Sequence, residues 1–103
     1  MTRTLQLPVS TGKVLELVAK EYGVSVADLQ GSSRKRPLPY ARKMFVYLMH
    51  LQQTHDVAAI MAAIEVPTQC YKEWVETMQL WVRQYADTRE HYSTLTKQLE
   101  KCE

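Results

Sequence analysis

The stretch that decides the fold is residues 56–86, which read DVAAIMAAIEVPTQCYKEWVETMQLWVRQYA. Asp56 suits the N-cap of a short helix over residues 57–63, and Pro67 suits the first turn of a second, longer helix that ends near Ala86. Apolar side chains recur at three- and four-residue spacing in both segments, as expected of helices with one buried face. A short helix, a turn of about three residues (64–66) and a second helix form a helix-turn-helix.

The residues before this stretch also predict helices. The apolar residues of segment 13–22 follow the helical period, and Gly23 supplies a left-handed stop. Ser25 and Asp28 have the spacing of a capping box, which opens a short helix that ends at Gly31. The N-terminal half therefore contributes at least two helices.

A long helix is predicted from Pro39 to about Gln53, and another follows a fresh cap at residues 87–90. The first carries one apolar stripe, formed by Met44, Phe45, Leu48 and either Leu51 or Gln52. The last carries Tyr92, Leu95, Leu99 and Cys102 on one stripe. The second helix of the helix-turn-helix has a stripe that we interpret as core, formed by Tyr71, Trp74, Met78, Trp81 and Tyr85.

Length and composition fit this pattern. The chain has 103 residues, of which 46% are hydrophobic and only three are glycine and four proline, so disorder and a turn-rich β architecture are disfavoured. We predict an all-α fold, a small helical bundle of about five to six helices. Residues 1–12 are an N-terminal arm, and residues 13–103 are one helical domain.

Catalytic and metal-binding chemistry is not indicated. Cys70 and Cys102 form no C-x-x-C pair, and His50, His55 and His91 lack the spacing of metal ligands. No paired carboxylates or nucleophile and base grouping is evident, so we expect no catalytic residue, no metal and no cofactor, and the chain is not predicted to be an enzyme. No signal peptide or membrane span is evident, which predicts a cytoplasmic protein without a membrane partner.

The positive charge is concentrated in one interval. The formal net charge is only +2, yet no acidic residue lies between Asp28 and Asp56. Five cations fall inside that interval: Arg34, Lys35, Arg36, Arg42 and Lys43. The first three lie in a segment bracketed by Gly31 and two prolines, which predicts a basic loop. One face of the domain is therefore expected to be strongly positive.

Residues 14–29, VLELVAKEYGVSVADL, resemble the opening of the C-terminal DNA-binding domain of the bacterial replication initiator DnaA. The resemblance continues through the basic loop at residues 33–36 and the helix with Ala-Arg-Lys-Met at residues 41–44. It implies an all-helical, Trp-repressor-like helix-turn-helix that docks a recognition helix in the major groove and a loop arginine in the minor groove. Arg34 and Arg36 would take the loop role.

Two features set the chain apart from that family. The signature Gly-Gly-Arg-Asp-His-Thr-Thr, which opens the family's recognition helix, is replaced by Glu-Val-Pro-Thr-Gln-Cys-Tyr at residues 65–71. The chain also has no G-x-x-x-x-G-K-[ST] phosphate loop, so no nucleotide is expected to bind. We therefore expect a divergent, stand-alone relative that does not fire replication origins alone.

The predicted partner is double-stranded DNA, bound without catalysis in a replication-initiator-like or regulatory role. Arg34, Lys35, Arg36, Arg42 and Lys43 would contact phosphates or the minor groove, and all five are expected to be exposed. Thr68, Gln69 and Lys72, on the first turns of the second helix, would face base edges, with Gln69 suited to adenine. The alternative is that these groups are ordinary solvated residues at a loop and a helix start.

A protein-interaction module is the competing functional hypothesis. In it, the fold persists without sequence-specific DNA recognition, and the long aromatic helix binds a protein partner or a second copy of the chain. An exposed apolar patch spanning Trp74 and Trp81 would favour this hypothesis, whereas burial of both side chains would disfavour it.

Overall fold

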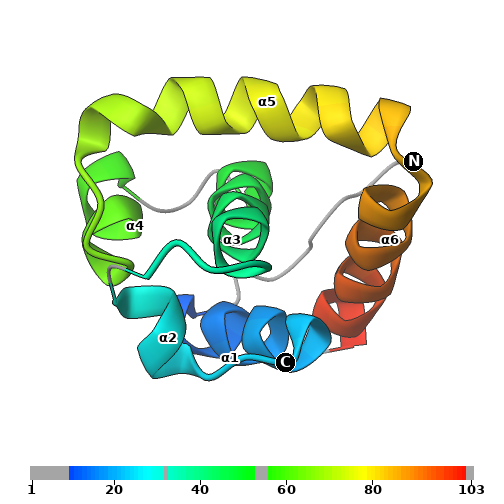
Figure 1. Cartoon of the computed structure of the whole chain (residues 1–103), viewed down its shortest axis with the longest axis horizontal. Coiled ribbons are helices and arrows are strands. Elements are labelled where there is room, and N and C mark those ends of the chain that lie inside the picture. The colour runs from blue at the N-terminus through cyan, green and yellow to red at the C-terminus, as the bar shows by residue number, and fades with distance from the viewer. Residues whose placement is uncertain (1–9, 32, 53–55, 102–103) are drawn as a thin grey trace.

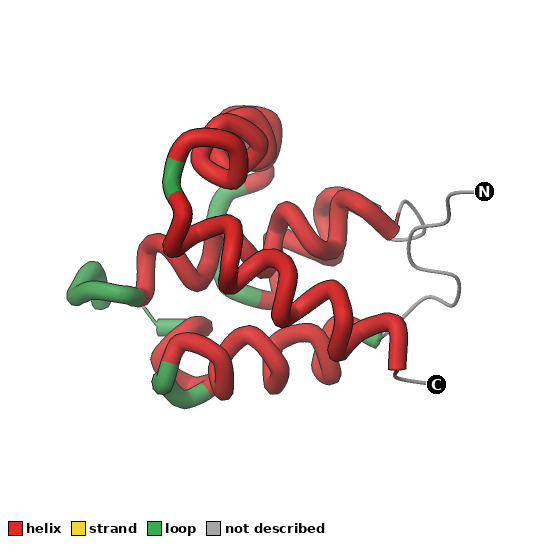
Figure 2. Tube along the Cα trace, turned by 90° about the vertical axis from the view of Figure 1, so that its right-hand side faces the viewer, coloured by secondary structure: helices red, strands yellow, loops and turns green. Residues whose placement is uncertain are grey.

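The computed structural model describes residues 10–31, 33–52 and 56–101. Most of the predicted N-terminal arm (1–12), as well as His55 and Cys102, lies outside these residues. The described part has six α-helices, one short 3-10 helix and no strand, which confirms the predicted all-α fold (Figure 2). The helices are α1 (Thr11–Tyr22), α2 (Val26–Gln30), α3 (Leu38–Gln52), α4 (Val57–Ala63), the 3-10 helix η1 (Thr68–Cys70), α5 (Tyr71–Gln84) and α6 (Ala86–Lys101).

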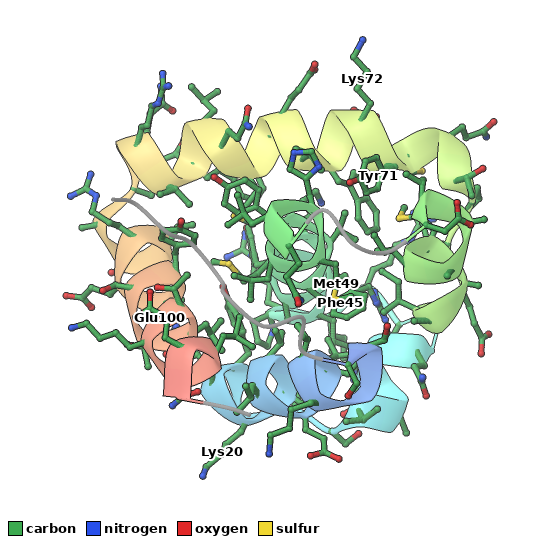
Figure 3. All side chains as sticks on the ribbon, turned by 180° about the vertical axis from the view of Figure 1, so that it is seen from behind. Lys20, Phe45, Met49, Tyr71, Lys72 and Glu100 are labelled. Atoms are coloured by element: carbon green, nitrogen blue, oxygen red, sulfur yellow. The ribbon has the colours of Figure 1, made fainter. Side chains whose placement is uncertain are left out.

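Helix α3 lies at the centre of the domain, and the other helices are arranged around it (Figure 1). Phe45 and Met49 lie in the middle of the molecule in Figure 3, and residues 44–49 are all buried. The prediction of a single apolar stripe is therefore wrong for this helix. Its unbroken run of apolar residues, MFVYLM, packs in every direction because neighbours surround it.

The predicted capping box of α2 and the predicted stop of α1 at Gly23 are confirmed. Helix α1 begins at Thr11, two residues before the predicted start at residue 13, because Ser10 Oγ caps it by accepting a hydrogen bond from the Lys13 amide at 3.2 Å. Ser25 Oγ accepts a hydrogen bond from the Asp28 amide at 3.0 Å, and the Asp28 carboxylate accepts one from the Ser25 amide at 3.4 Å. Gly23 ends α1 with φ 71°, a left-handed conformation that glycine adopts without steric cost. Local sequence thus sets these boundaries.

The boundaries in the C-terminal half differ in detail from the prediction. Asp56 stands at the N-cap of α4, but its side chain makes no capping hydrogen bond with a described residue. The second helix begins as η1 after Pro67 and continues as α5. Tyr85 is extended, with φ −112° and ψ 123°, and separates α5 from α6. Asp87 lies in the first turn of α6 and not at the predicted cap.

The aromatic stripe of α5 is core only in part. Met78 is fully buried, whereas Trp74 and Trp81 are half-buried and pack against the core. Tyr85 is 53% exposed, so its assignment to the core is wrong, because the break in the helix turns it outward. In α6, Leu95 and Leu99 are buried, as predicted.

Candidate nucleic-acid interface

The helix-turn-helix is formed by α4, the turn at residues 64–66, and η1 with α5. Two backbone hydrogen bonds close the turn, from the Val66 amide to the Met61 carbonyl (3.0 Å) and from the Glu65 amide to the Ala62 carbonyl (3.1 Å). This pair of bonds is a Schellman motif, which needs a left-handed residue. Glu65 fills that place with φ 56°, where glycine is usual.

A side-chain hydrogen bond joins the start of the basic loop to this turn. Gln30 at the end of α2 donates through Nε2 to the carbonyl oxygen of Ala63, at the end of α4, over 2.9 Å. Gln30 directly precedes the segment that becomes the loop, and Ala63 directly precedes the turn. The loop and the second helix of the helix-turn-helix therefore start from the same end of the molecule, where α2 and α4 lie side by side (Figure 1).

Arg42 fixes the shape of the basic loop. Its guanidinium donates to four backbone carbonyls, those of Leu29 (2.9 Å), Ser33 (2.6 Å), Asp28 (2.9 Å) and Gly31 (2.9 Å). These carbonyls belong to the end of α2 and to the loop, so one side chain caps a short helix and holds the segment after it.

The expectation that Arg42 is exposed is wrong. The residue is only 6% exposed, because it lies on the face of α3 that also carries Leu38, Phe45 and Met49. Burial lowers the pKa of Arg42 from its ordinary value, while the nearby Asp28 carboxylate acts against that change. The guanidinium stays charged even so, and its charge is directed at the loop backbone.

The remaining loop cations face solvent. Arg34, Lys35 and Arg36 are all exposed, and within the described residues none of their side chains forms an ion pair or a hydrogen bond. Three consecutive cations without an intramolecular partner form the most positive segment of the described surface. Their exposure agrees with the prediction from the sequence.

Lys43 has a different environment. Its ammonium nitrogen lies 4.9 Å from the ring centre of Trp74 and 5.7 Å from that of Trp81, so it packs between α3 and α5. Burial lowers the pKa of Lys43, and the carboxylate of Glu73 opposes that effect. Lys43 is thus half-buried and not exposed, and a cation held over two indole rings contributes to the packing of the core.

The start of the second helix presents polar side chains but little positive charge. Thr68, Gln69 and Lys72 are exposed, and Figure 3 shows Lys72 pointing away from the body of the domain. Glu73 and Glu76 are also exposed on α5. The positive charge of this end therefore gathers on the loop and not on the helix.

Tyr71 points inward from the same turn toward α3 (Figure 3). Its hydroxyl lies 2.7 Å from Nδ1 of His50, and burial raises the pKa of Tyr71. This hydrogen bond fixes how the first turn of α5 sits on the core.

Other polar groups of the described residues show no metal chemistry. No cluster of three or more His, Cys, Asp or Glu that could hold a metal occurs among them. Cys70 is a free, half-buried thiol, and His91 pairs with Glu21 at 2.8 Å. None of the described helices is long and apolar enough to span a membrane.

Two contacts that position the loop were not anticipated from the sequence. The burial of Arg42 could have been predicted, because Leu38, Phe45 and Met49 lie at helical spacing from it and mark a buried face. The contact of Gln30 with Ala63 could not have been predicted from a local pattern, since the two residues are 33 positions apart in the sequence.

These features together define a helix-turn-helix domain with an exposed basic loop beside its turn. The family model described as "Bacterial dnaA protein helix-turn-helix" matches residues 11–65, just over half of the chain. The chain belongs to this family, as the resemblance of the sequence indicated. The match ends at Glu65, where the departure from the family signature begins.

Individual relatives carry the name chromosomal replication initiator protein DnaA. The protein of Rippkaea orientalis is 46% identical over 44 residues, which cover 43% of this chain and 10% of the relative. The protein of Crocosphaera subtropica is 43% identical over 44 residues, covering 43% of this chain and 10% of the relative. That of Gloeothece citriformis is 44% identical over 50 residues, covering 44% of this chain and 11% of the relative. The matched region is thus about a tenth of the length of these initiators.

Proposed function

We propose that this domain binds double-stranded DNA without catalysis, in a replication-initiator-like or regulatory role in the cytoplasm. The observation that carries the proposal is the exposed triplet Arg34, Lys35 and Arg36, on a loop that Arg42 holds beside the helix-turn-helix. The family match supports it, because the matched residues include this loop and the whole first helix of the helix-turn-helix.

The residues divide into three roles in this proposal. Arg34, Lys35 and Arg36 contact phosphates or enter the minor groove, which favours arginine. Thr68, Gln69 and Lys72 face base edges, since polar groups at the start of a recognition helix enter the major groove first, and the ammonium of Lys72 also neutralises a neighbouring phosphate. Arg42 and Lys43 act indirectly, by fixing the loop and by packing α3 against α5.

The salt dependence of binding tests the phosphate contacts without knowledge of the target sequence. Each neutralised phosphate adds about −0.9 to the slope of log affinity against log salt, so three loop cations predict a slope of about −2.7, and Lys72 would bring it to about −3.6. Fluorescence anisotropy of a labelled duplex at several salt concentrations measures this slope.

A double variant with a matched control makes the test specific to the loop. Arg34→Ala with Arg36→Ala should weaken binding and flatten the slope by up to about two units, with stability changed by less than about 0.5 kcal/mol per site. Lys20→Ala with Lys97→Ala removes the same charge from exposed positions on α1 and α6 and should leave the slope nearly unchanged. Equal effects of the two pairs, or no duplex binding at low salt, would overturn the proposal.

Sequence preference tests the second helix separately. Gln69→Ala or Thr68→Ala should alter which duplexes are selected from a random library, with a loss of about 1 to 3 kcal/mol of discrimination per good base contact. The salt slope should stay the same. If these variants select the same duplexes as the parent, the helix start does not contact bases.

The burial of Trp74 and Trp81 neither favours nor disfavours the protein-interaction hypothesis. Trp74 and Trp81 are neither exposed as one patch nor fully buried, because both are half-buried against the core. The large apolar residue exposed within α5 is Leu80, at 49%. DNA binding therefore remains the function that the described residues support best.

A further inference from the structure

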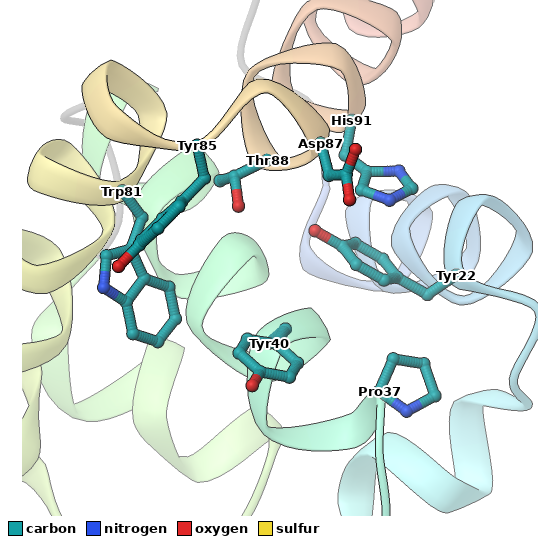
Figure 4. Close-up of a pocket in the computed structure, with 8 residues that line it drawn as sticks. All are labelled: Tyr22, Pro37, Tyr40, Trp81, Tyr85, Asp87, Thr88 and His91. Atoms are coloured by element: carbon teal, nitrogen blue, oxygen red, sulfur yellow. The ribbon is translucent and has the colours of Figure 1, made fainter.

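A pocket of about 420 Å³ opens where α1, α3, α5 and α6 meet. Tyr22, Tyr40, Trp81 and Tyr85 surround the opening, with Pro37 on one side and Asp87, Thr88 and His91 on another (Figure 4). This volume is in the range of small-ligand sites. None of its lining residues has a role in the proposed DNA contacts.

The aromatic rings form a partial box. The Tyr40 and Trp81 ring centres are 5.5 Å apart with planes tilted by 50°, and those of Trp81 and Tyr85 are 6.4 Å apart at 69°. Tyr22 stands across the opening from Trp81 in Figure 4. Rings that meet at such angles turn faces as well as edges toward the enclosed space, and an aromatic face attracts cations through its quadrupole.

The charged groups at the pocket point to the same class of ligand. Asp87 contributes a carboxylate, while no Lys or Arg is among the lining residues. His91 Nδ1 is engaged by the Glu21 carboxylate at 2.8 Å. Lys43 Nζ lies 5.7 Å from the ring centre of Trp81, but Lys43 is not part of the lining. A phosphate or carboxylate ligand would therefore meet no Lys or Arg in the lining and would be repelled by Asp87. A neutral aromatic ligand would make no use of that carboxylate, which is exposed and solvated.

We propose that this pocket binds an organic ammonium group, held against the aromatic rings with Asp87 as its counter-charge. The same chemistry is presented by a free small amine and by a lysine side chain of a protein partner, methylated or not. The proposal does not depend on DNA binding, because it concerns other residues.

Choline and 3,3-dimethyl-1-butanol provide a matched pair of probes, because the two molecules have nearly the same shape and only choline carries a positive charge. The second has a carbon atom where choline has its quaternary nitrogen. The readout is the indole N–H signal of Trp81 in a ¹⁵N–¹H NMR spectrum of the full chain. Trp74 lies outside the pocket lining and is the internal reference. We expect choline to shift the Trp81 signal saturably and to bind about tenfold more tightly than the neutral analogue, a ratio that corresponds to about 1.4 kcal/mol.

Two variant pairs locate the site. Asp87→Asn should weaken choline binding about threefold, whereas Glu90→Gln, an exposed change on the same helix outside the lining, should not. Tyr85→Ala should weaken it about threefold, whereas Leu80→Ala should not, and both residues are exposed enough that the fold should tolerate the change. Unchanged remaining NMR signals check that each variant is folded.

A capped trimethyl-lysine amide distinguishes the two sources. Binding at least tenfold tighter than that of choline indicates a protein side chain, and equal binding indicates a free amine; either result supports the pocket. The proposal is overturned if choline and its neutral analogue act alike, if neither shifts Trp81, or if Asp87→Asn and Glu90→Gln weaken binding equally.

Discussion

Replacing Arg42 should destabilise the domain far more than replacing any other cation of the basic segment. Its guanidinium makes four hydrogen bonds to backbone carbonyls, and the bond from Nε to Leu29 is buried. A hydrogen bond to a charged group contributes about 1.5 to 3 kcal/mol to the free energy of unfolding when the bond is shielded from water. The other three hydrogen bonds are only partly buried, so water can replace part of what is lost.

Arg42→Met keeps the length of the side chain and removes all four bonds, and we expect it to lower the free energy of unfolding by about 3 kcal/mol. Arg42→Lys keeps the positive charge, but an ammonium group lacks the planar set of donors with which the guanidinium reaches several carbonyls. We therefore expect this variant to lower the free energy of unfolding by about 2 kcal/mol. Urea denaturation followed by far-UV circular dichroism measures both values, because the described part of the chain is helical. A loss below about 1 kcal/mol for the Met variant would refute this account of the loop.

The same substitution separates a positioning residue from a phosphate contact. If Arg42 only holds the loop, Arg42→Lys should weaken duplex binding at every salt concentration and leave the slope of log affinity against log salt unchanged. Arg34→Ala or Arg36→Ala should instead reduce that slope by about 0.9 each. A comparable fall in slope for an uncharged Arg42 variant would show that its guanidinium reaches DNA.

Three further predictions concern stability. Tyr71→Phe removes the hydrogen bond to His50 and should lower the free energy of unfolding, measured by thermal denaturation, by about 1 kcal/mol. Tyr85→Phe, at an exposed site, should lower it by less than about 0.5 kcal/mol. Burial raises the pKa values of Tyr22, Tyr47 and Tyr92, so their contribution to stability is complete below about pH 10 and is lost as the pH rises further. The lowered pKa of Lys43 has a weak effect in the opposite direction. Tyr22→Phe should therefore make the free energy of unfolding fall less steeply as the pH rises above about 10. If the free energy of unfolding falls with pH as steeply in the variant as in the parent, the prediction is wrong. Glu65→Gly should be about 0.5 to 1 kcal/mol more stable to urea than Glu65→Ala, because φ 56° favours glycine, and the reverse order would mean that the turn carries no strain.

Local signals in the sequence predicted the boundary between the first two helices, but not the start of α1 or the break between α5 and α6. Ser25 and Asp28 form their capping box, and Gly23 takes the left-handed stop, because these preferences depend only on residues a few positions apart. Tyr85 was assigned to the core because an extended residue that interrupts a periodic stripe leaves no mark in the period itself. The unbroken apolar run at residues 44–49 did indicate a helix covered on all sides, although a single stripe was inferred from it.

The candidate interface was predictable where it depends on composition and not where it depends on distant contacts. Arg34 and Arg36 are exposed as predicted, since a short segment between a glycine and a proline has little apolar surface to bury. The role of Arg42 depends on carbonyls 9 to 14 residues away, and its charge alone suggested solvent. The pocket gathers residues from four helices, which no local pattern brings together.

The left-handed conformation of Glu65 bears on how this domain can change by mutation. Glutamate and glycine codons differ only at the second base, so a single transition would place glycine at residue 65. The backbone there already has a conformation that glycine accepts, and the hydrogen bonds that close the turn come from main-chain atoms. The first glycine of the family signature is thus one mutational step away and requires no rebuilding of the turn. The main-chain geometry at residue 65 is therefore compatible with either residue, whereas the side chains at residues 66–71 differ from that signature.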